Sequence, residues 1–275
     1  MTTEKVFQFG EQQQLFGIVT EPSATLQTKP AVLLLNAGLV HRVGPYRMAV
    51  ILARRLADLG YLVFRFDLSN IGDSANNRDT DDYRRRTEKE IRAAQDIVTE
   101  KYSINQFIAM GLCTGAMNAH VITVADKRIV GAVLLDAYAY PTMKSLINRY
   151  KSKLRKMLDR ALFRRLTKKL TYSRHQENET IGEGIDYWVF PPKEEVEKEL
   201  SELIQRQVEL LFVYAGSFEY FYNYPEQLQD NFPSIDFRDQ VSVHILKDSD
   251  HMYTLYEDTE ILLQLIIDWV SKKFH

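Results

Sequence analysis

The sequence lacks the features that anchor a protein in a membrane or cross-link a small secreted domain through disulfides. It contains one cysteine, Cys113, so no disulfide can form within the chain. No apolar run reaches the roughly 20 residues that a bilayer-spanning helix needs, and the polar start, MTTEKVFQFG, is unlike a secretory signal. We therefore expect no transmembrane segment and, because a free thiol suits a reducing compartment, a cytoplasmic location.

Internal repeats, low-complexity tracts and a dominant charge sign are also missing. The 35 Lys and Arg residues nearly balance the 37 Asp and Glu residues, and the net charge of −2 argues against general nucleic-acid binding. What is present is ordinary for a globular protein, with 45% hydrophobic residues in 275. A chain of this length can bury a full core without help from metals or disulfides.

Two kinds of strand pattern are present. Residues 5–10 and 14–21 predict an antiparallel hairpin, because two strand-like segments flank a short polar turn. Later strands are short runs rich in Val, Ile, Leu and Phe, as expected where both faces of a sheet are covered. These runs lie at 31–35, 61–66, 107–111, 129–135, 210–214 and 241–246.

Amphipathic helical segments alternate with these runs. We expect helices over 46–60, 86–102, 116–125 and 258–274. Such alternation predicts right-handed crossovers and a mostly parallel, doubly wound α/β sheet. Residues 141–207 interrupt the alternation with helical, highly charged sequence that is too long for a simple connection. We interpret them as an inserted helical cap on a core formed by 1–140 and 208–275.

The segment MGLCTGA places Cys113 in the pattern Gly-x-nucleophile-x-Gly, after a strand and before a helix. Flanking glycines permit a tight strand-to-helix turn from which the central residue projects, and the following helix N-terminus favours a thiolate. The simpler interpretation is a small apolar residue buried at a strand end, because cysteine is among the most frequently buried residues.

A nucleophile needs a base, and the base needs an acid that orients it. His251 follows the last strand and precedes the final helix, whereas His41, after the first core strand, is the rival. Glu219 lies three residues beyond Gly216, past the strand over 210–214. The resulting order along the chain, Cys113, Glu219, His251, is that of one known triad architecture.

On these residues the chain resembles the α/β-hydrolase superfamily. The segment LLLNAGL resembles its first core strand and oxyanion loop, FRFDLSNIGDS a segment after the next strand, and MGLCTGA its nucleophile elbow. The combination of NAGLVHRVGPYR, FDLSNIGDS and GLCTGA is also similar to bacterial hydrolases associated with exosortase systems. The chain departs from the common pattern in carrying Cys for Ser and Glu for Asp, although both occur in the superfamily, Cys notably in dienelactone hydrolases.

The resemblance implies further site residues. In this fold one oxyanion donor is the backbone N–H after the nucleophile, here Thr114, and the other comes from the loop after the first core strand, here Leu39, with Gly38 allowing close approach. Asp136, which ends the strand after the nucleophile helix, is the alternative acid because some members place their acid there. We expect Asp248 and Asp250 to shape the turn that carries His251.

The predicted cap is strongly basic in its first half. Residues 144–174 contain twelve Lys or Arg and one Asp, on a helical apolar pattern, and the acidic segment EEVEKELSE follows. Two cap helices pairing their opposite charges in water is the plainer interpretation. A functional one is that the basic face steers an anionic acyl substrate, small or carrier-bound, and docking on a membrane surface is a third.

We therefore expect a hydrolase that cleaves an ester, thioester or lactone through an acyl-Cys113 intermediate, with neither metal nor cofactor. An acyltransferase or cyclase that passes the acyl group to an acceptor other than water is the alternative. A non-catalytic binding protein that retains the fold is the third hypothesis. The sequence does not specify the oligomeric state.

Overall fold

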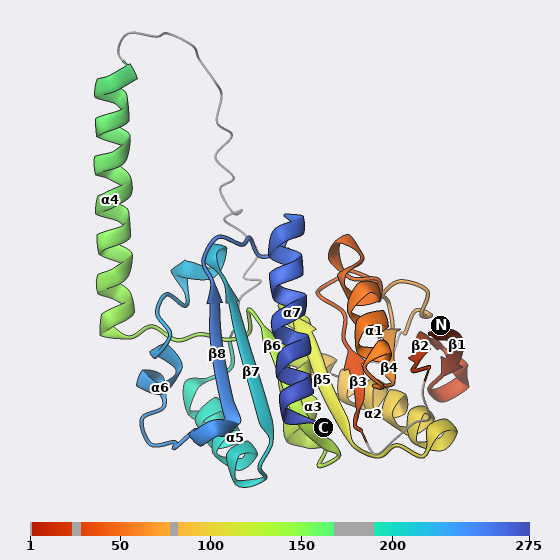
Figure 1. The fold of residues 1–275 in the computed structure, drawn as a ribbon. Helices are drawn as coiled ribbons and strands as arrows, with labels where there is room; N and C mark the ends of the chain where they lie inside the picture. Colours follow the sequence, from red (N-terminus) through yellow and green to blue (C-terminus); the bar gives the residue numbers. More distant parts are fainter. Residues whose placement is uncertain (1, 24–28, 78–81, 168–189) are drawn as a thin grey trace.

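A single twisted sheet forms the centre of the molecule in the computed structural model of the chain (Figure 1). The structure describes residues 2–23, 29–77, 82–167 and 190–275, and of residues 156–167 only the backbone. The strands are β1 (Thr3–Phe9), β2 (Leu15–Glu21), β3 (Ala31–Leu34), β4 (Val63–Asp67), β5 (Phe107–Leu112), β6 (Ile129–Leu135), β7 (Glu209–Ala215) and β8 (Val241–Leu246).

The strand order is β1-β2-β4-β3-β5-β6-β7-β8. Strand β1 pairs antiparallel with β2, and β2 pairs antiparallel with β4, whereas all pairs from β4 to β8 are parallel. The predicted hairpin and the mostly parallel sheet are both confirmed. Because parallel strands point the same way, the residues that follow β3, β5, β6, β7 and β8 gather at one edge.

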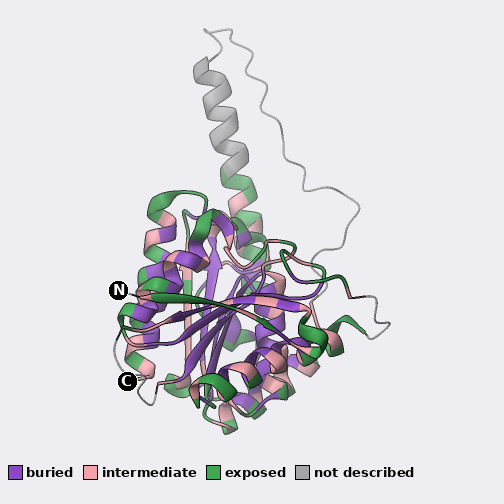
Figure 2. Ribbon diagram, turned by 90° about the vertical axis from the view of Figure 1, so that its right-hand side faces the viewer, coloured by how far each residue is buried: buried purple, intermediate pink, exposed green. Residues whose placement is uncertain are grey.

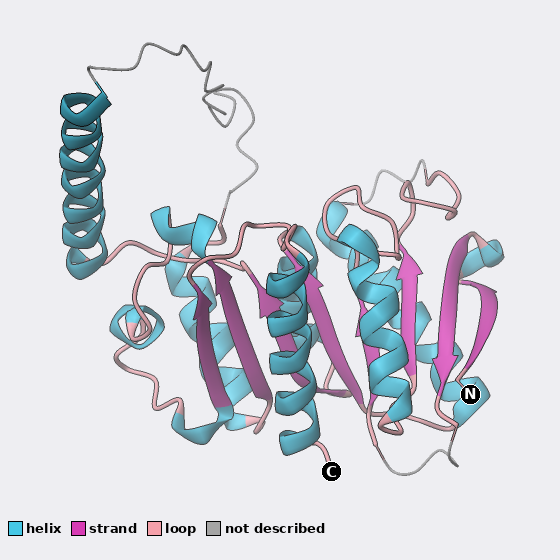
Figure 3. Ribbon diagram, turned by 45° about the horizontal axis from the view of Figure 1, so that its top comes forward, coloured by secondary structure: helices cyan, strands magenta, loops and turns pink. Residues whose placement is uncertain are grey.

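Helices cover both faces of the sheet, with α1 and α7 on one face and α2, α3 and α5 on the other (Figures 1 and 3). The helices are α1 (Met48–Asp58), α2 (Tyr83–Tyr102), α3 (Thr114–Ala125), α4 (Met143–Thr167), α5 (Lys193–Gln205), α6 (Gln227–Asn231) and α7 (Tyr256–Lys273). Short 3-10 turns are η1 (Glu11–Gln13), η2 (Pro45–Arg47), η3 (Gly216–Tyr220) and η4 (Arg238–Gln240).

Two apolar cores lie on the two faces, which explains the near-continuous apolar runs of the central strands. On one face, Leu56 of α1 and Ile266 of α7 belong to the same buried cluster as Ile108 and Val133. On the other face Ala119 of α3 belongs to a larger cluster that includes the aromatic rings at the ends of β6 and β7. Figure 2 shows this buried interior between exposed outer helices.

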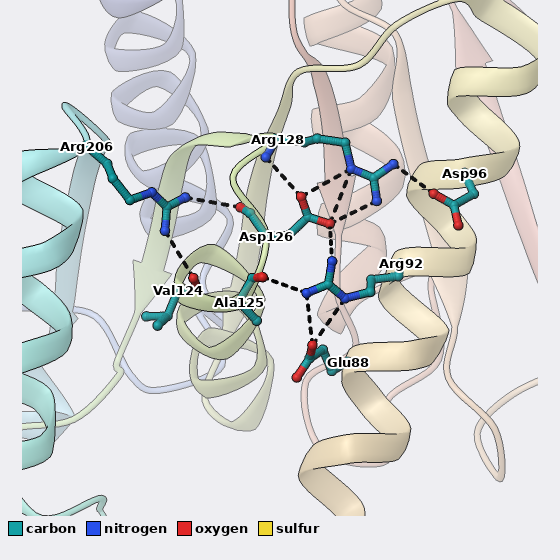
Figure 4. A network of polar contacts seen from close by, with 8 residues as sticks. All are labelled: Glu88, Arg92, Asp96, Val124, Ala125, Asp126, Arg128 and Arg206. Carbon is teal, nitrogen blue, oxygen red and sulfur yellow. Dashed lines mark hydrogen bonds and ion pairs between the residues drawn. The ribbon is translucent and has the colours of Figure 1, made fainter.

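A charged network ties α2, α3 and α5 together at the edge where β6 begins (Figure 4). Asp126, almost fully buried, accepts hydrogen bonds from Arg92 Nη1 at 2.7 Å and Arg128 Nη2 at 2.9 Å. Burial disfavours the carboxylate, yet the hydrogen bonds and charges of these arginines outweigh it and lower the pKa of Asp126. Arg206, just after α5, donates to the carbonyl oxygens of Val124 and Asp126.

The segment predicted as a cap, residues 141–207, divides into unlike parts. Helix α4 projects from the body beyond the carboxyl edge of the sheet (Figure 1). Helix α5 instead joins the helical layer, because Val196, Leu200 and Leu203 are fully buried in the core. The cap prediction therefore fails for its last part, and residues 168–189 lie outside the described residues.

The sequence suggested that the acidic residues of α5 pair with the basic helix, but two of them have other partners. Glu195 and Glu199 pair with Arg84 of α2 at 2.9 and 3.0 Å, and Glu199 also lies 2.8 Å from His120 Nε2 of α3. Pairing of these two carboxylates with the basic helix is thus not what the structure shows. Among the helices of the described segments, none has both the length and the apolar character required to cross a bilayer.

Candidate active site

Cys113 occupies a strained turn between β5 and α3. Its φ of +59° and ψ of −122° lie in a region that side-chain-bearing residues rarely adopt. A Cβ at Gly111 would lie 2.2 Å from the backbone of Gly115, and one at Gly115 would lie 2.4 Å from the carbonyl oxygen of Asn36. Both glycines are therefore required for the turn, and half-buried Cys113 stands at the carboxyl edge of the sheet.

His251 and Asp136 reach the same edge from different strands. Asp136 follows β6 directly, is fully buried and has a φ of +46°. Its Oδ2 lies 2.6 Å from His251 Nδ1, and its Oδ1 accepts a hydrogen bond of 2.7 Å from the Ala215 N–H. His251, in the turn after β8, also hydrogen-bonds Cys113. Three side chains that are far apart in the sequence thus form one line of contacts.

The contacts of His251 favour its charged, protonated form. Burial disfavours the imidazolium, but the hydrogen bonds and charges of Asp136 and Cys113 outweigh it and raise the pKa of His251 to about 9. Burial also raises the pKa of Asp136, against the opposing effect of its contact with His251. Because both Asp136 oxygens have a partner that donates hydrogen bonds, we take this carboxyl to be ionised at neutral pH.

Glu219 does not take the place predicted for it. The turn η3 begins right after β7 and carries Glu219 onto an exposed surface. There it lines a hollow of about 370 Å³ together with Asn148 and Arg149 of α4. The carboxylate that contacts His251 belongs to the alternative acid, Asp136. Asp136 follows β6, which lies between β5 and β7 in the sheet.

The oxyanion residues named from the sequence lie beside the elbow. Thr114 opens α3, whose first N–H groups have no acceptor within the helix. Across from it, residues 37–40 form a tight turn in which the Val40 N–H bonds the Ala37 oxygen at 2.9 Å and Gly38 has a φ of +55°. The Gly38 N–H donates to Thr114 Oγ1 at 2.7 Å. Leu39 follows Gly38 in this turn, with a side chain that is 89% exposed.

The buried carboxylate of Asp67, a residue without a predicted role, braces this turn. Asp67, at the end of β4, accepts hydrogen bonds from Asn36 Nδ2 at 3.0 Å and the Arg42 N–H at 2.6 Å, and it pairs with the Arg42 guanidinium. A Cβ at Gly72 would lie 2.3 Å from Asp67 Oδ2. The segment FDLSNIGDS thus supports the turn over residues 37–40. Its signal in the sequence is an acid after a buried strand, followed by a close glycine.

The other histidines and acids weighed in the sequence lie elsewhere. His41 is exposed, and His120 is buried against Glu199. Asp250 accepts hydrogen bonds from the N–H groups of Met252 and Thr254, so it shapes the turn of His251 as expected. Within the residues that the structure describes, no group of three or more His, Cys, Asp or Glu could hold a metal ion.

A small apolar cavity of about 50 Å³ lies beside the elbow, and Cys113, Asp136 and His251 are not among the residues that line it. Its walls include Asn36 and Gly111 together with Met48 and Leu52 of α1 and Ile266 of α7. Tyr138 and Tyr222 are packed, each about 1% exposed, whereas Tyr220 is exposed and lines the hollow beside α4.

The fold has counterparts among solved structures. An α/β serine hydrolase without a lid from Xanthomonas campestris is 14% identical, with a TM-score of 0.58, over 99% of this chain and 95% of that one. The esterase domain of a Rhodothermus marinus protein is 14% identical, with a TM-score of 0.57, over 100% and 99%. An α/β hydrolase from a Penicillium species is 17% identical, with a TM-score of 0.59, over 99% and 98%.

These likenesses concern the fold. No protein-family model and no curated protein matches the sequence. The α/β-hydrolase fold expected from the sequence, a mostly parallel sheet with an antiparallel N-terminal hairpin, is confirmed. At such low identity the chemistry has to be argued from the residues of this chain.

Proposed function

We propose that the protein is a cysteine-dependent hydrolase that cleaves an ester, a thioester or a lactone. The observation that carries the proposal is the contact line from Cys113 through His251 to buried Asp136 at one edge of the sheet. The likeness to esterases and other α/β hydrolases adds support at the level of the fold. In this proposal the triad acid is Asp136 rather than Glu219.

The first half of the reaction forms an acyl-enzyme. Asp136 holds His251 through Nδ1, and Nε2 takes the thiol proton of Cys113 before the attack, which leaves a thiolate beside a charged imidazole. The sulfur attacks the carbonyl carbon, and the oxygen becomes an oxyanion that the N–H groups of Thr114 and Leu39 stabilise. When this intermediate collapses, the bond to the leaving alcohol or thiol breaks and His251 returns the proton to the departing group.

The second half releases the product. His251 removes a proton from a water molecule, the resulting nucleophile attacks the thioester carbonyl of acyl-Cys113, and the Cys–acyl bond breaks to give a carboxylic acid and the free thiol. A thiolate is a good leaving group, so activated acyl groups are better substrates for this site than peptides. Since a catalytic thiol persists in a reducing compartment, we place the enzyme in the cytoplasm.

The Thr114 hydroxyl has a positioning role in this scheme. Its hydrogen bond from the Gly38 N–H joins the oxyanion turn to the nucleophile helix. The same bond occupies the Gly38 amide, which leaves the next amide, that of Leu39, as the second donor to the substrate. The bond also keeps both donors at a defined separation, as electrostatic stabilisation of an oxyanion requires.

The test is a panel of short and long acyl esters, thioesters and lactones, run with the wild type and with Cys113→Ala. We expect turnover by the wild type and loss of it in the variant. Because Cys113 is the single cysteine, iodoacetamide alkylation and intact mass report on this site alone. Accumulation of an acyl adduct that water does not resolve, but that an added alcohol, amine or thiol does, would assign acyl transfer instead. A fully active Cys113→Ala variant, or a thiol inert to iodoacetamide at neutral pH, would refute the proposal.

A further inference from the structure

Helix α4 is fixed to the body only at its base in the part whose side chains the structure describes. Asn148 Nδ2 lies 3.2 Å from Asn223 Oδ1, and Lys144 lies 3.2 Å from Glu226. The guanidinium of Arg149 sits over the ring of Tyr220 at 4.1 Å. Beyond these contacts the helix extends away from the sheet (Figure 1). The part of α4 beyond its base therefore lies outside the core.

The exposed side of α4 is apolar. Met143, Ile147, Tyr150 and Leu154 are 74, 50, 75 and 53% exposed. Their spacing of four, three and four residues places them on one stripe of the helix. This set of four residues is called the apolar stripe below. A helix that only had to face water would not present such a stripe to it.

The side of α4 that faces the body is polar, which is the reverse of an ordinary surface helix. Ser145 and Asn148 make hydrogen bonds there, with Thr142 and Asn223. Ser152 lines the hollow between α4 and η3. Packing on the core therefore does not account for the apolar stripe, and the stripe is available to a partner outside this part of the fold.

Cations flank the stripe on both sides. Lys151 and Arg155 follow one flank and Lys153 the other at 100° per residue, and all three are exposed. The sequence has no acidic residue between 143 and 158. The acidic helix that follows, α5, uses Glu195 and Glu199 in pairs with Arg84. The charge of the basic helix is therefore not offset by those carboxylates.

We propose that α4 docks the protein on the surface of an anionic lipid bilayer. The apolar stripe enters the boundary between headgroups and acyl chains, and the flanking cations contact lipid phosphates, as in interfacial amphipathic helices. Charge complementarity selects this occupant, since a straight apolar stripe with cations along both flanks matches a flat anionic surface.

The proposal is tested by co-sedimentation of the full chain with vesicles. One preparation is phosphatidylcholine alone, and the other is phosphatidylcholine with one third phosphatidylglycerol. We expect binding to the anionic vesicles only, and weaker binding at high salt because ions screen the lysines. Cys113→Ala should bind like the wild type, so that failure of the proposed catalysis leaves this result unaffected.

Two pairs of substitutions separate the apolar and charged contributions. Ile147→Glu with Leu154→Glu should weaken binding at least about tenfold, whereas Ile261→Glu, an exposed apolar residue of α7, should not. Lys151→Glu with Lys153→Glu should weaken it at least about 25-fold, because each cation near the surface contributes about fivefold.

The matched control for the charge pair is Lys127→Glu with Lys272→Glu, which reverses two exposed lysines away from α4 and should bind like the wild type. Circular dichroism verifies that each variant is folded. A wild type that ignores anionic vesicles, or an Ile147→Glu, Leu154→Glu variant that binds them fully, overturns the proposal. So does a dimer in light scattering that Leu154→Glu dissociates while vesicles do not compete, since a second copy would then be the occupant. A loss of kcat/KM towards anionic substrates alone, without any change in vesicle binding, would assign the cations to substrate steering and also overturns it.

Discussion

Asp136→Asn is the substitution that most directly tests the site. The change keeps the size of the side chain and removes the charge that faces His251 at 2.6 Å. The pKa of His251, about 9 against an ordinary 6.5, corresponds to about 3 kcal/mol of imidazolium stabilisation at ~1.4 kcal/mol per pH unit. Part of this belongs to Cys113, and the His251 side chain is 29% exposed, so we assign about 2 kcal/mol to Asp136.

We therefore expect the pKa of His251 to fall towards its ordinary value and kcat/KM to fall at least about 30-fold, because about 2 kcal/mol less stabilises the charged imidazole in the transition state. Loss of the correct tautomer adds to this. NMR titration of the histidine ring measures the first effect, and hydrolysis of an activated ester or thioester measures the second.

The matched control is Glu219→Gln, the same carboxylate-to-amide change at the acid predicted from the sequence. Glu219 is exposed on η3, so kcat/KM and the His251 titration should stay within about twofold of the wild type. The reverse result, in which kcat/KM is kept in Asp136→Asn and lost in Glu219→Gln, would refute the assignment of the acid.

Three further predictions concern stability and the oxyanion turn. Because folding raises the pKa of His251, the free energy of unfolding that wild type gains over His251→Gln is fully present below pH 6.5 and is lost as the pH rises towards 9, which urea denaturation across this range measures. Thr114→Val removes the acceptor of the Gly38 N–H and should lower kcat/KM about tenfold, whereas Thr114→Ser retains it; equal activity of the two variants contradicts the positioning role. Gly115→Ala places a Cβ 2.4 Å from the Asn36 oxygen and should destabilise the fold by about 1–3 kcal/mol, and an unchanged urea midpoint counts against the packing argument.

Local pattern was sufficient for most of the architecture. The runs at 129–135 and 241–246 have the bounds of β6 and β8. Strand β6 is apolar throughout because both its faces are covered, whereas β8 is a half-buried strand at the edge of the sheet. The elbow was recognisable because its glycines are a local requirement of the turn that carries Cys113. His251 was recognisable because it follows the last strand.

The cap was harder to predict because charge and helical spacing do not say what a helix packs against. Helices α4 and α5 are both charged and amphipathic in sequence. Val196 and Leu200 carry α5 into the core, whereas Ile147 and Leu154 leave α4 with an apolar side that faces outward. Whether the apolar side of a helix is buried depends on where the helix lies in the fold.

By itself, the sequence was sufficient to predict the sheet and to select Cys113 and His251 as the proposed nucleophile and base, since each rests on short-range requirements: apolar strands, glycines in a tight turn, and a histidine at a strand end. Which carboxylate contacts His251 was decided only by tertiary structure. Asp136 and Glu219 both follow buried strands, and the local pattern of the sequence favoured the second. The sheet order places β6 next to β5, the turn at Asp136 directs its carboxylate to His251, and η3 carries Glu219 to the surface. Residues 136 and 251 follow different strands and come into contact only in the folded sheet. No periodicity along the chain therefore predicts this contact.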